Sequence, residues 1–166
     1  MSTAIQGKQV IYLYRIYEER STAAGTRLAF VTEDSKSISI DSDSTPTKDG
    51  SVRTAGVPEI EKSVTTILTK EDEMLPKLKA AALDSKLIEL WEANLAKPIQ
   101  NQNNKFAGTY YQGYITSFEE TTNAEGLAEV SMTIGVNGKG ADGNVTVSTD
   151  QQDDAAYTFV DTPISA

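Results

Sequence analysis

The clearest alternation of apolar and polar positions in this chain lies within residues 106–140. Residues 127–136 alternate strictly, and a period of two predicts a strand with one packed face and one hydrated face. Residues 109–120 are rich in Tyr, Ile, Thr and Phe, which favour strands. The polar residues 121–126 separate the two runs, so we expect a β-hairpin. The polar positions of its second strand are Glu129, Ser131 and Thr133.

Similar patterns predict strands before and after this hairpin. Residues 9–18 are apolar on both faces, which is typical of a strand that is buried on two sides or covered by a neighbouring chain. Residues 58–69 alternate again, with Glu59 and Glu61 on the polar face. Shorter strand-like runs lie at residues 26–31, 35–43, 86–94 and 144–149, with Trp91 as the expected core anchor.

One helix and one long loop complete the pattern. An apolar stripe at helical spacing follows residue 73, and Thr69 or Asp72 is a candidate cap. Pro76 lacks the N–H that an interior position needs, so either the regular helix starts near Leu75 or its first turn is irregular. Residues 42–56 are polar and rich in Ser, Thr, Gly and Pro, which predicts a loop of a length that is usually functional or disordered. Seven or eight strands and one helix predict a mainly β protein, a β-sandwich or barrel with one flanking α-helix.

Composition narrows the chemistry. At 166 residues the chain fits a single domain, here 1–166. It contains no His and no Cys, which removes the commonest general base, the thiolate nucleophile and the usual zinc ligands. The Gly-x-Gly-x-x-Gly pattern at 138–143 is followed by a strand-like run, although a dinucleotide site needs a helix there, so we expect the glycine-rich stretch 137–144 to form a flexible turn. We therefore expect no enzyme, no catalytic or metal-binding residue and no cofactor.

Charge is distributed unevenly. The net charge is −9, of which −2 falls on residues 1–104 and −7 on residues 105–166. Tight binding of nucleic acid needs Lys and Arg against the phosphates, so this balance argues against it. The balance suits a solvated surface, or one that repels a polyanion. No apolar stretch reaches the roughly 18 residues of a transmembrane helix, and the first residues do not form a signal peptide, so no membrane contact is expected.

Several segments together resemble a known family. They are the Thr-rich loop with Val52-Arg53-Thr54, the acidic run Lys70–Glu73, the strand beginning Lys86-Leu87-Ile88, and the run from Phe106 to Glu119. In order and spacing the chain resembles the major tail (tail tube) proteins of long, non-contractile-tailed phages (siphophages) of Gram-positive hosts. The similarity covers about residues 7–140.

The resemblance implies a β-sandwich that assembles into hexameric rings, with the inner strands forming a continuous β-barrel around a lumen and the rings stacking into a tube. Residues 1–8 and 150–166 would act as arms, and loop 41–57 would reach a neighbouring subunit or ring. The residues singled out in that loop are Thr45, Pro46, Lys48, Asp49, Gly50 and Arg53.

The same resemblance implies partners and a location. Besides itself, the chain would contact the tape measure protein and tail terminator or distal tail proteins, and phage DNA would pass through without tight binding. It would reside in the virion tail after assembly in the host cytoplasm. An acidic lumen would let DNA slide, and the residues expected to face it are Glu129, Ser131, Thr133, Glu59 and Glu61.

Two other functions fit the pattern less well. A monomeric β-sandwich that binds carbohydrate would explain Tyr110, Tyr111 and Tyr114 as a stacking platform. It would not explain the long polar loop or the first strand, which is apolar on both faces. The tube subunit of a contractile injection system would share the same physics but carry a different cargo.

Overall fold

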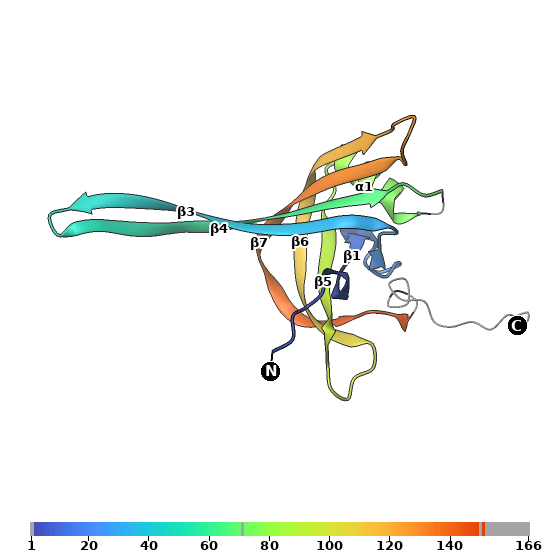
Figure 1. The fold of residues 1–166 in the computed structure, drawn as a ribbon, viewed down its shortest axis with the longest axis horizontal. Helices are drawn as coiled ribbons and strands as arrows, with labels where there is room; N and C mark the ends of the chain where they lie inside the picture. Colours follow the sequence, from blue (N-terminus) through green and yellow to red (C-terminus); the bar gives the residue numbers. More distant parts are fainter. Residues whose placement is uncertain (1, 71, 150, 152–166) are drawn as a thin grey trace, which may run out of the picture.

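The computed structural model describes residues 2–70, 72–149 and 151 (Figure 1). Every strand in this part of the chain belongs to one antiparallel sheet with the order β2-β1-β5-β6-β7-β4-β3. The elements are β1 (Val10–Ile16), β2 (Thr26–Arg27), β3 (Val31–Thr47), β4 (Gly50–Ile67), α1 (Met74–Leu83), β5 (Ile88–Pro98), β6 (Lys105–Thr121) and β7 (Glu129–Thr146), with short 3-10 turns at Gly7–Gln9 and Tyr17–Glu19. No helix among the described residues is long and apolar enough to cross a membrane.

The sheet folds into two layers. β3 and β4 run across the direction of β5 and β6 (Figure 1), and β6 and β7 take part in both layers. Bulges in the β6–β7 ladder after Tyr110 and Ile115 allow the bend, as in orthogonal β-sandwiches. At Gly113 a Cβ atom would lie 2.2 Å from a carbonyl oxygen of β7, so the bend requires glycine there. The mainly β class with one helix is thus confirmed, and the two layers of the sandwich are parts of one sheet.

The main core lies between these layers and under α1. β1 and β5 contribute Tyr14, Ile88 and Leu90, each at most 1% exposed, while Leu78 of α1 is completely buried. β4 and β7 contribute alternate residues from the opposite layer. Pro76 is the third residue of α1 and needs no N–H partner there. Asp72 Oδ1 accepts hydrogen bonds from the N–H groups of the first two helical residues, as expected for a cap.

Four local predictions need correction. The strand expected at 26–31 is only the two residues of β2, because the chain turns at Ala29-Phe30, where Phe30 adopts a positive φ of 48°. The glycine-rich stretch 137–144 is not a turn but part of β7, which pairs with β6 as far as Thr146. The strand expected at 144–149 is therefore the end of β7. Trp91, expected as the core anchor, is only partly buried and packs on a second, smaller cluster on the back of β1 and β5.

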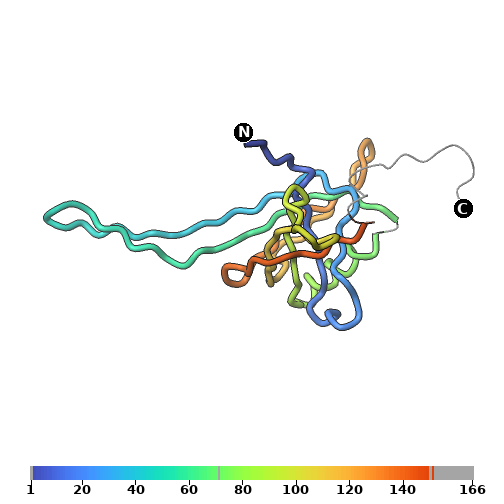
Figure 2. The backbone as a smooth tube through the Cα atoms, turned by 90° about the horizontal axis from the view of Figure 1, so that it is seen from below, coloured from blue at the N-terminus to red at the C-terminus, as the bar shows by residue number. Residues whose placement is uncertain are grey.

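The predicted loop 41–57 is a two-stranded arm. β3 and β4 stay paired from Ser42–Ala55 to Thr47–Gly50, leaving a two-residue turn at Lys48-Asp49. Polar β-branched and Ser residues fill the strands, and every residue from 41 to 57 is exposed. Figures 1 and 2 show this arm projecting far from the body as a narrow ribbon. The length and polarity of this segment favoured a loop, but its two halves pair with each other and form a hairpin.

The structure describes the two predicted terminal arms to different extents. Residues 2–6 are exposed and precede the first 3-10 turn. Of the C-terminal arm 150–166, only Gln151 is described, and the rest lies outside the described residues.

Candidate functional site: an acidic strand face and a projecting arm

One face of the layer formed by β3, β4, the end of β6 and the start of β7 is acidic and rich in hydroxyl groups. It points away from the core, because the alternate residues of its two central strands, such as Val64 of β4 and Met132 of β7, are buried. We call it the glutamate face. Its members are Glu33, Ser35, Ser37, Ser39, Glu59, Glu61, Ser63, Thr65, Ser117, Glu119, Thr121, Glu129, Ser131 and Thr133.

The register of the strands brings these residues side by side. Ser63 pairs with Thr133 across β4 and β7, with their hydroxyl oxygens 3.4 Å apart. The hydroxyls of Thr65 and Ser131 lie 3.2 Å apart in the next pair on the same face. Cross-strand neighbours of this kind form a continuous hydroxyl-lined surface between the glutamates.

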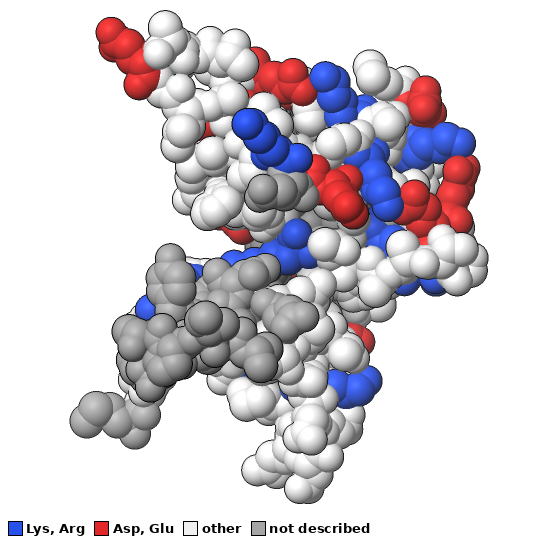
Figure 3. Space-filling model, turned by 90° about the vertical axis from the view of Figure 1, so that its right-hand side faces the viewer, with Lys and Arg blue, Asp and Glu red and all other residues white. Residues whose placement is uncertain are grey.

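The face carries five glutamates and, in these described strand segments, no Lys or Arg. The two lysines of the same segments, Lys36 and Lys62, occupy the opposite face and point between the layers. On the side of the body away from the arm, acidic and basic residues lie next to one another (Figure 3). Ion pairs such as Lys79–Glu120 join the two signs of charge elsewhere in the described chain. The glutamate face differs in carrying acids without bases.

The structure brings together every residue expected to face a lumen. Glu59 and Glu61 of β4 lie on the same face as Glu129, Ser131 and Thr133 of β7, although about 70 residues separate them in sequence.

Sequence reasoning missed the contribution of β6 and β3. Glu119 and Glu120 are consecutive and lie on opposite faces of β6, and the bulge after Ile115 shifts the alternation so that Glu119 is the one on the glutamate face. In β3, the serines at alternate positions were a usable signal, and Glu33 extends that series after the bulge near Val31.

The glutamate face ends at two unpaired strand edges. β3 is the last strand of the sheet and pairs only with β4. β6 leaves β5 after Gly113, so its segment 114–121 pairs only with β7 among the described strands. Unpaired edges of this length are templates for strands of another chain.

The arm gathers all of the loop residues named from sequence. Thr45, Pro46, Lys48, Asp49, Gly50 and Arg53 lie in its outer half. Gly50 closes the turn with a φ of 127°, a conformation that favours glycine. Arg53 donates a hydrogen bond to Ser42 Oγ at 3.2 Å. The exposed Ile40, Val52 and Val57 give the arm apolar surface that the body does not cover.

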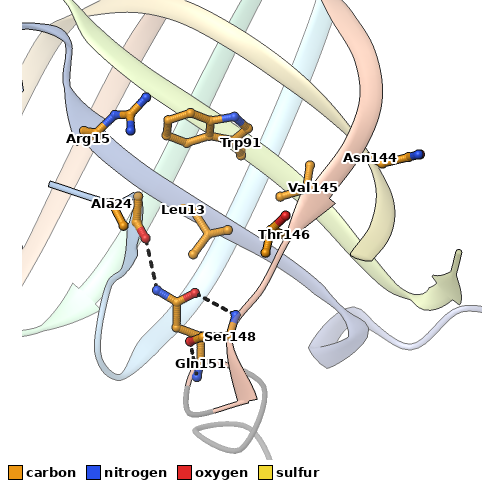
Figure 4. A pocket seen from close by; sticks show the side chains of 10 residues that line it. Leu13, Arg15, Ala24, Trp91, Asn144, Val145, Thr146, Ser148 and Gln151 are labelled. Carbon is orange, nitrogen blue, oxygen red and sulfur yellow. Dashed lines mark hydrogen bonds between the residues drawn. The ribbon is translucent and has the colours of Figure 1, made fainter. Parts of the chain in front are cut away.

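The tyrosines do not form the flat platform that carbohydrate binding would need. Tyr111 is buried in the core between the layers. Tyr110 lies on the other face, donates a hydrogen bond to buried Glu89, and packs obliquely against Trp91 with ring centroids 5.3 Å apart. The guanidinium of Arg15 lies 4.8 Å from the centre of the Trp91 ring, beside a cavity of about 440 Å³ (Figure 4). One face of the Trp91 ring is thus covered by arginine.

Comparison with known proteins agrees with this arrangement. The sequence profile described as "Phage tail tube protein" matches residues 4–142. A protein described as "Putative tail protein" from Staphylococcus phage phiMR25 is 33% identical over 156 residues, covering 92% of this chain and 80% of that protein.

Solved structures share the fold. The SPP1 tail tube, determined by solid-state NMR and cryo-EM, superposes with a TM-score of 0.77 at 21% identity, over 96% of this chain and 92% of that one. The tail of an empty gene transfer agent particle, refined with C6 symmetry, gives a TM-score of 0.62 at 13% identity, over 87% and 100% of the two chains.

A sheath–tube complex of an extracellular contractile injection system gives a TM-score of 0.54 at 11% identity, over 89% and 95% of the two chains. The fold is therefore common to contractile and non-contractile tubes, whereas the matching profile and relative are those of phage tails. The profile covers most of the residues that build both layers and the arm. This chain belongs to the phage tail tube protein family and is a structural component of the virion tail.

Proposed function

We propose that six copies form a ring in which the glutamate face lines the lumen, and that rings stack through the arms into a conduit for phage DNA. The observation that carries this proposal is the acidic four-stranded face with an unpaired strand at each side. The chain is proposed to act as a structural subunit and not as an enzyme.

The two free edges support ring closure. Along the layer, β6, β7, β4 and β3 alternate in direction. Rotation about an axis parallel to the strands preserves strand direction, so β3 of one copy would meet the segment 114–121 of the next in antiparallel orientation. Joining the copies in this way removes both edges. A barrel of about 24 strands, four from each of six copies, is wide enough for an aqueous channel.

The chemistry of the face supports the passage of DNA. Carboxylates repel phosphates, and without Lys or Arg there is no counterion release to hold the polyanion. The hydroxyl groups between the glutamates keep the wall hydrated. A duplex would therefore move along such a wall without adhering to it.

The arm supports stacking. It projects from one end of the body, so a contact between the arm of one copy and the body of another joins unlike surfaces (Figure 2). Contacts between unlike surfaces that do not close on themselves generate open filaments. A tube of stacked rings is such a filament, and its two ends are where tail terminator or distal tail proteins would bind. The tape measure protein would occupy the lumen before DNA does, and assembly would take place in the host cytoplasm.

Site-specific labelling tests the orientation. The chain has no cysteine, so Ser131→Cys introduces a single thiol on the glutamate face, and Ala80→Cys places one on the exposed side of α1 as a matched control. Subunits carrying a thiol-reactive gold cluster are assembled and imaged by cryo-EM. We expect gold on the tube axis for position 131 and outside the wall for position 80. Gold outside the wall for position 131 would overturn the lumen assignment.

A tube of a contractile machine is the second candidate, because the tube of a contractile injection system also shares the fold. Such a tube needs a sheath around it. If electron microscopy of purified tubes shows no binding of a sheath protein from the same tail, the non-contractile assignment is favoured.

A further inference from the structure

A set of charged and phenolic side chains joins the two layers where the arm leaves the body. It consists of Tyr12 (β1), Asp34 and Lys36 (β3), Lys62 (β4), Glu92 (β5) and Tyr111 (β6). β3 lies at the edge of one layer, and β5 belongs to the other. These contacts therefore cross the interior of the protein instead of following the ladder of one strand pair.

Lys36 makes the contact between the layers. Its Nζ lies 2.5 Å from Glu92 Oε2 and 3.1 Å from the hydroxyl of Tyr111. Burial acts to lower the pKa of Lys36, but the hydrogen bonds to Glu92 and Tyr111 outweigh it and raise the pKa above its ordinary value. The lysine is thus held in its charged form against a carboxylate of the opposite layer.

Lys62 forms a second pair beside the first. Its side chain is completely buried, its Nζ donates to Asp34 Oδ1, and it lies 3.8 Å from the centre of the Tyr12 ring. Burial lowers the pKa of Lys62, and the carboxylate of Asp34 opposes that effect. The hydroxyl of Tyr12 donates to Glu92 at 3.2 Å, which connects the two pairs.

These pairs stand at the root of the arm. In β3, Lys36 is the last residue that is even partly covered, and every residue from 37 to 47 is exposed. In β4, Ile60 is the last buried residue on that side, next to Lys62 in the alternation. β4 pairs with β7 as far as Ile60, which lies opposite Val136. Beyond Ile60 only the β3–β4 ladder and the twist of a two-stranded ribbon define the arm.

Apolar contacts at such a root resist separation but set no direction, because the hydrophobic effect is non-directional. An ion pair with hydrogen bonds has one preferred geometry. We propose that the Lys36–Glu92 pair, supported by Lys62–Asp34, sets the direction in which the arm leaves the body, and through it the geometry of stacking. The second part of this inference rests on the proposed function of the arm; the first does not.

The pair acts on direction more than on stability. Removing both charges of a buried pair is often neutral for folding, whereas removing one leaves the other unpaired. The test variant is therefore the double substitution Lys36→Met with Glu92→Gln, which keeps an acceptor for Tyr12. The control, Lys86→Met with Glu18→Gln, removes an exposed pair of 2.8 Å far from the arm.

The measurement is a distance distribution between spin labels by pulsed electron paramagnetic resonance. Labels are placed at Ser44→Cys on the arm and Ala80→Cys on α1, both exposed, in subunits kept dilute enough not to assemble. We expect one narrow distribution for the parent and the control. For the test variant we expect a broadened or shifted distribution with an unchanged thermal melting curve. The charge-reversed variant, Lys36→Glu with Glu92→Lys, is expected to restore the narrow distribution.

An unchanged distribution in the test variant would overturn the inference. Failure of that variant to fold would also overturn it, because the pair would then act on stability. The same proteins are next assembled and pelleted. A broadened distribution with normal tubes would support the role of the pair in arm direction and would contradict the proposed role of the arm in stacking, so the two failures are distinguishable.

Discussion

Gly56 provides the sharpest test of the arm, because its substitution perturbs the arm and leaves the core untouched. It lies in β4 opposite the bulge that follows Ile40 in β3. A Cβ atom at Gly56 would lie 2.8 Å from the backbone oxygen of Asp41 and 3.6 Å from its carbonyl carbon. Both contacts are with backbone, so Gly56→Ala forces the two strands of the arm apart.

The magnitude follows from this contact. Overpacking of this kind costs about 1–3 kcal/mol. Residues 41–57 are all exposed and belong to no core cluster, so the free energy of unfolding of the body is expected to change by less than about 0.5 kcal/mol. If the arm must keep its shape to bind a neighbouring subunit, the free-energy cost of the substitution falls entirely on assembly. Since 1.4 kcal/mol corresponds to a factor of ten, the critical concentration for assembly should rise roughly 5- to 150-fold.

The assay compares thermal unfolding of the dilute subunit with pelleting of tubes over a range of concentrations. The control is Gly126→Ala, where nothing lies within 4 Å of the added Cβ. We expect Gly56→Ala to melt like the parent but pellet only at higher concentration, and the control to match the parent in both. Parental pelleting by Gly56→Ala would refute the reasoning that the arm carries the stacking contact.

Three further predictions concern the body and the glutamate face. Gly108→Ala places a Cβ 2.0 Å from a carbonyl oxygen of β5, so we expect a loss of at least about 3 kcal/mol and a melting temperature lower by about 6–12 °C, measured by calorimetry. Tyr14→Phe removes a buried hydroxyl that has no hydrogen-bond partner among the described residues, so stability measured by denaturant titration should stay equal or rise by about 1 kcal/mol. Replacing Glu59, Glu61 and Glu129 together by Gln should leave tube formation intact and slow DNA release from virions, measured by fluorescence of a DNA-binding dye.

A different result would contradict each of these three predictions. Parental melting of Gly108→Ala would show that β5 and β6 can separate at that point without cost. A clear loss of stability in Tyr14→Phe would mean that the hydroxyl has a partner. The control for the triple substitution on the glutamate face replaces Glu18, Glu73 and Glu125 together by Gln, because these three residues lie off that face. Equal rates of DNA release for the two triple variants would contradict a role of the glutamate face in DNA passage.

Tyr14 also gives a prediction about pH. Burial raises the pKa of its hydroxyl well above the ordinary value of about 10, so above that pH the unfolded chain loses this proton while the folded protein keeps it. The folded state then binds more protons than the unfolded state, and stability falls as the pH rises. Denaturant titrations between about pH 9 and 11 should show a smaller fall for Tyr14→Phe than for the parent.

Local pattern determined much of the secondary structure. The alternation in 127–136 and 58–69 identified strands that lie in β7 and β4, together with their polar faces, since a strand with one hydrated face needs a period of two. Residues 9–18 were predicted to form a strand buried on two sides or covered by a neighbouring chain; β1 spans 10–16 of this run, and core clusters pack on both of its sides. The region where α1 starts was indicated by the candidate caps Thr69 and Asp72 and by Pro76, whose effects act within one helical turn.

Where the pattern failed, pairing with a partner strand had overridden it. Residues 41–57 have the composition of a loop, and their strand structure depends on a partner strand to complete the hydrogen bonds. The glycines of 137–144 lie in β7 because β6 approaches them closely, as at Gly140, where a Cβ would lie 2.5 Å from the Tyr111 ring. In β6 the two bulges reverse the side-chain alternation, which no period of two can reveal.

By itself, the sequence determined the mainly β class, the single helix and the acidic polar strands, because these depend on residues close together in the chain. Only the tertiary structure decided that Glu33, Glu59, Glu61, Glu119 and Glu129 share one face, since strand register is set between segments far apart in sequence. It also decided that Lys36 and Lys62 turn inward, because their carboxylate partners lie on other strands brought near by the fold of the sheet.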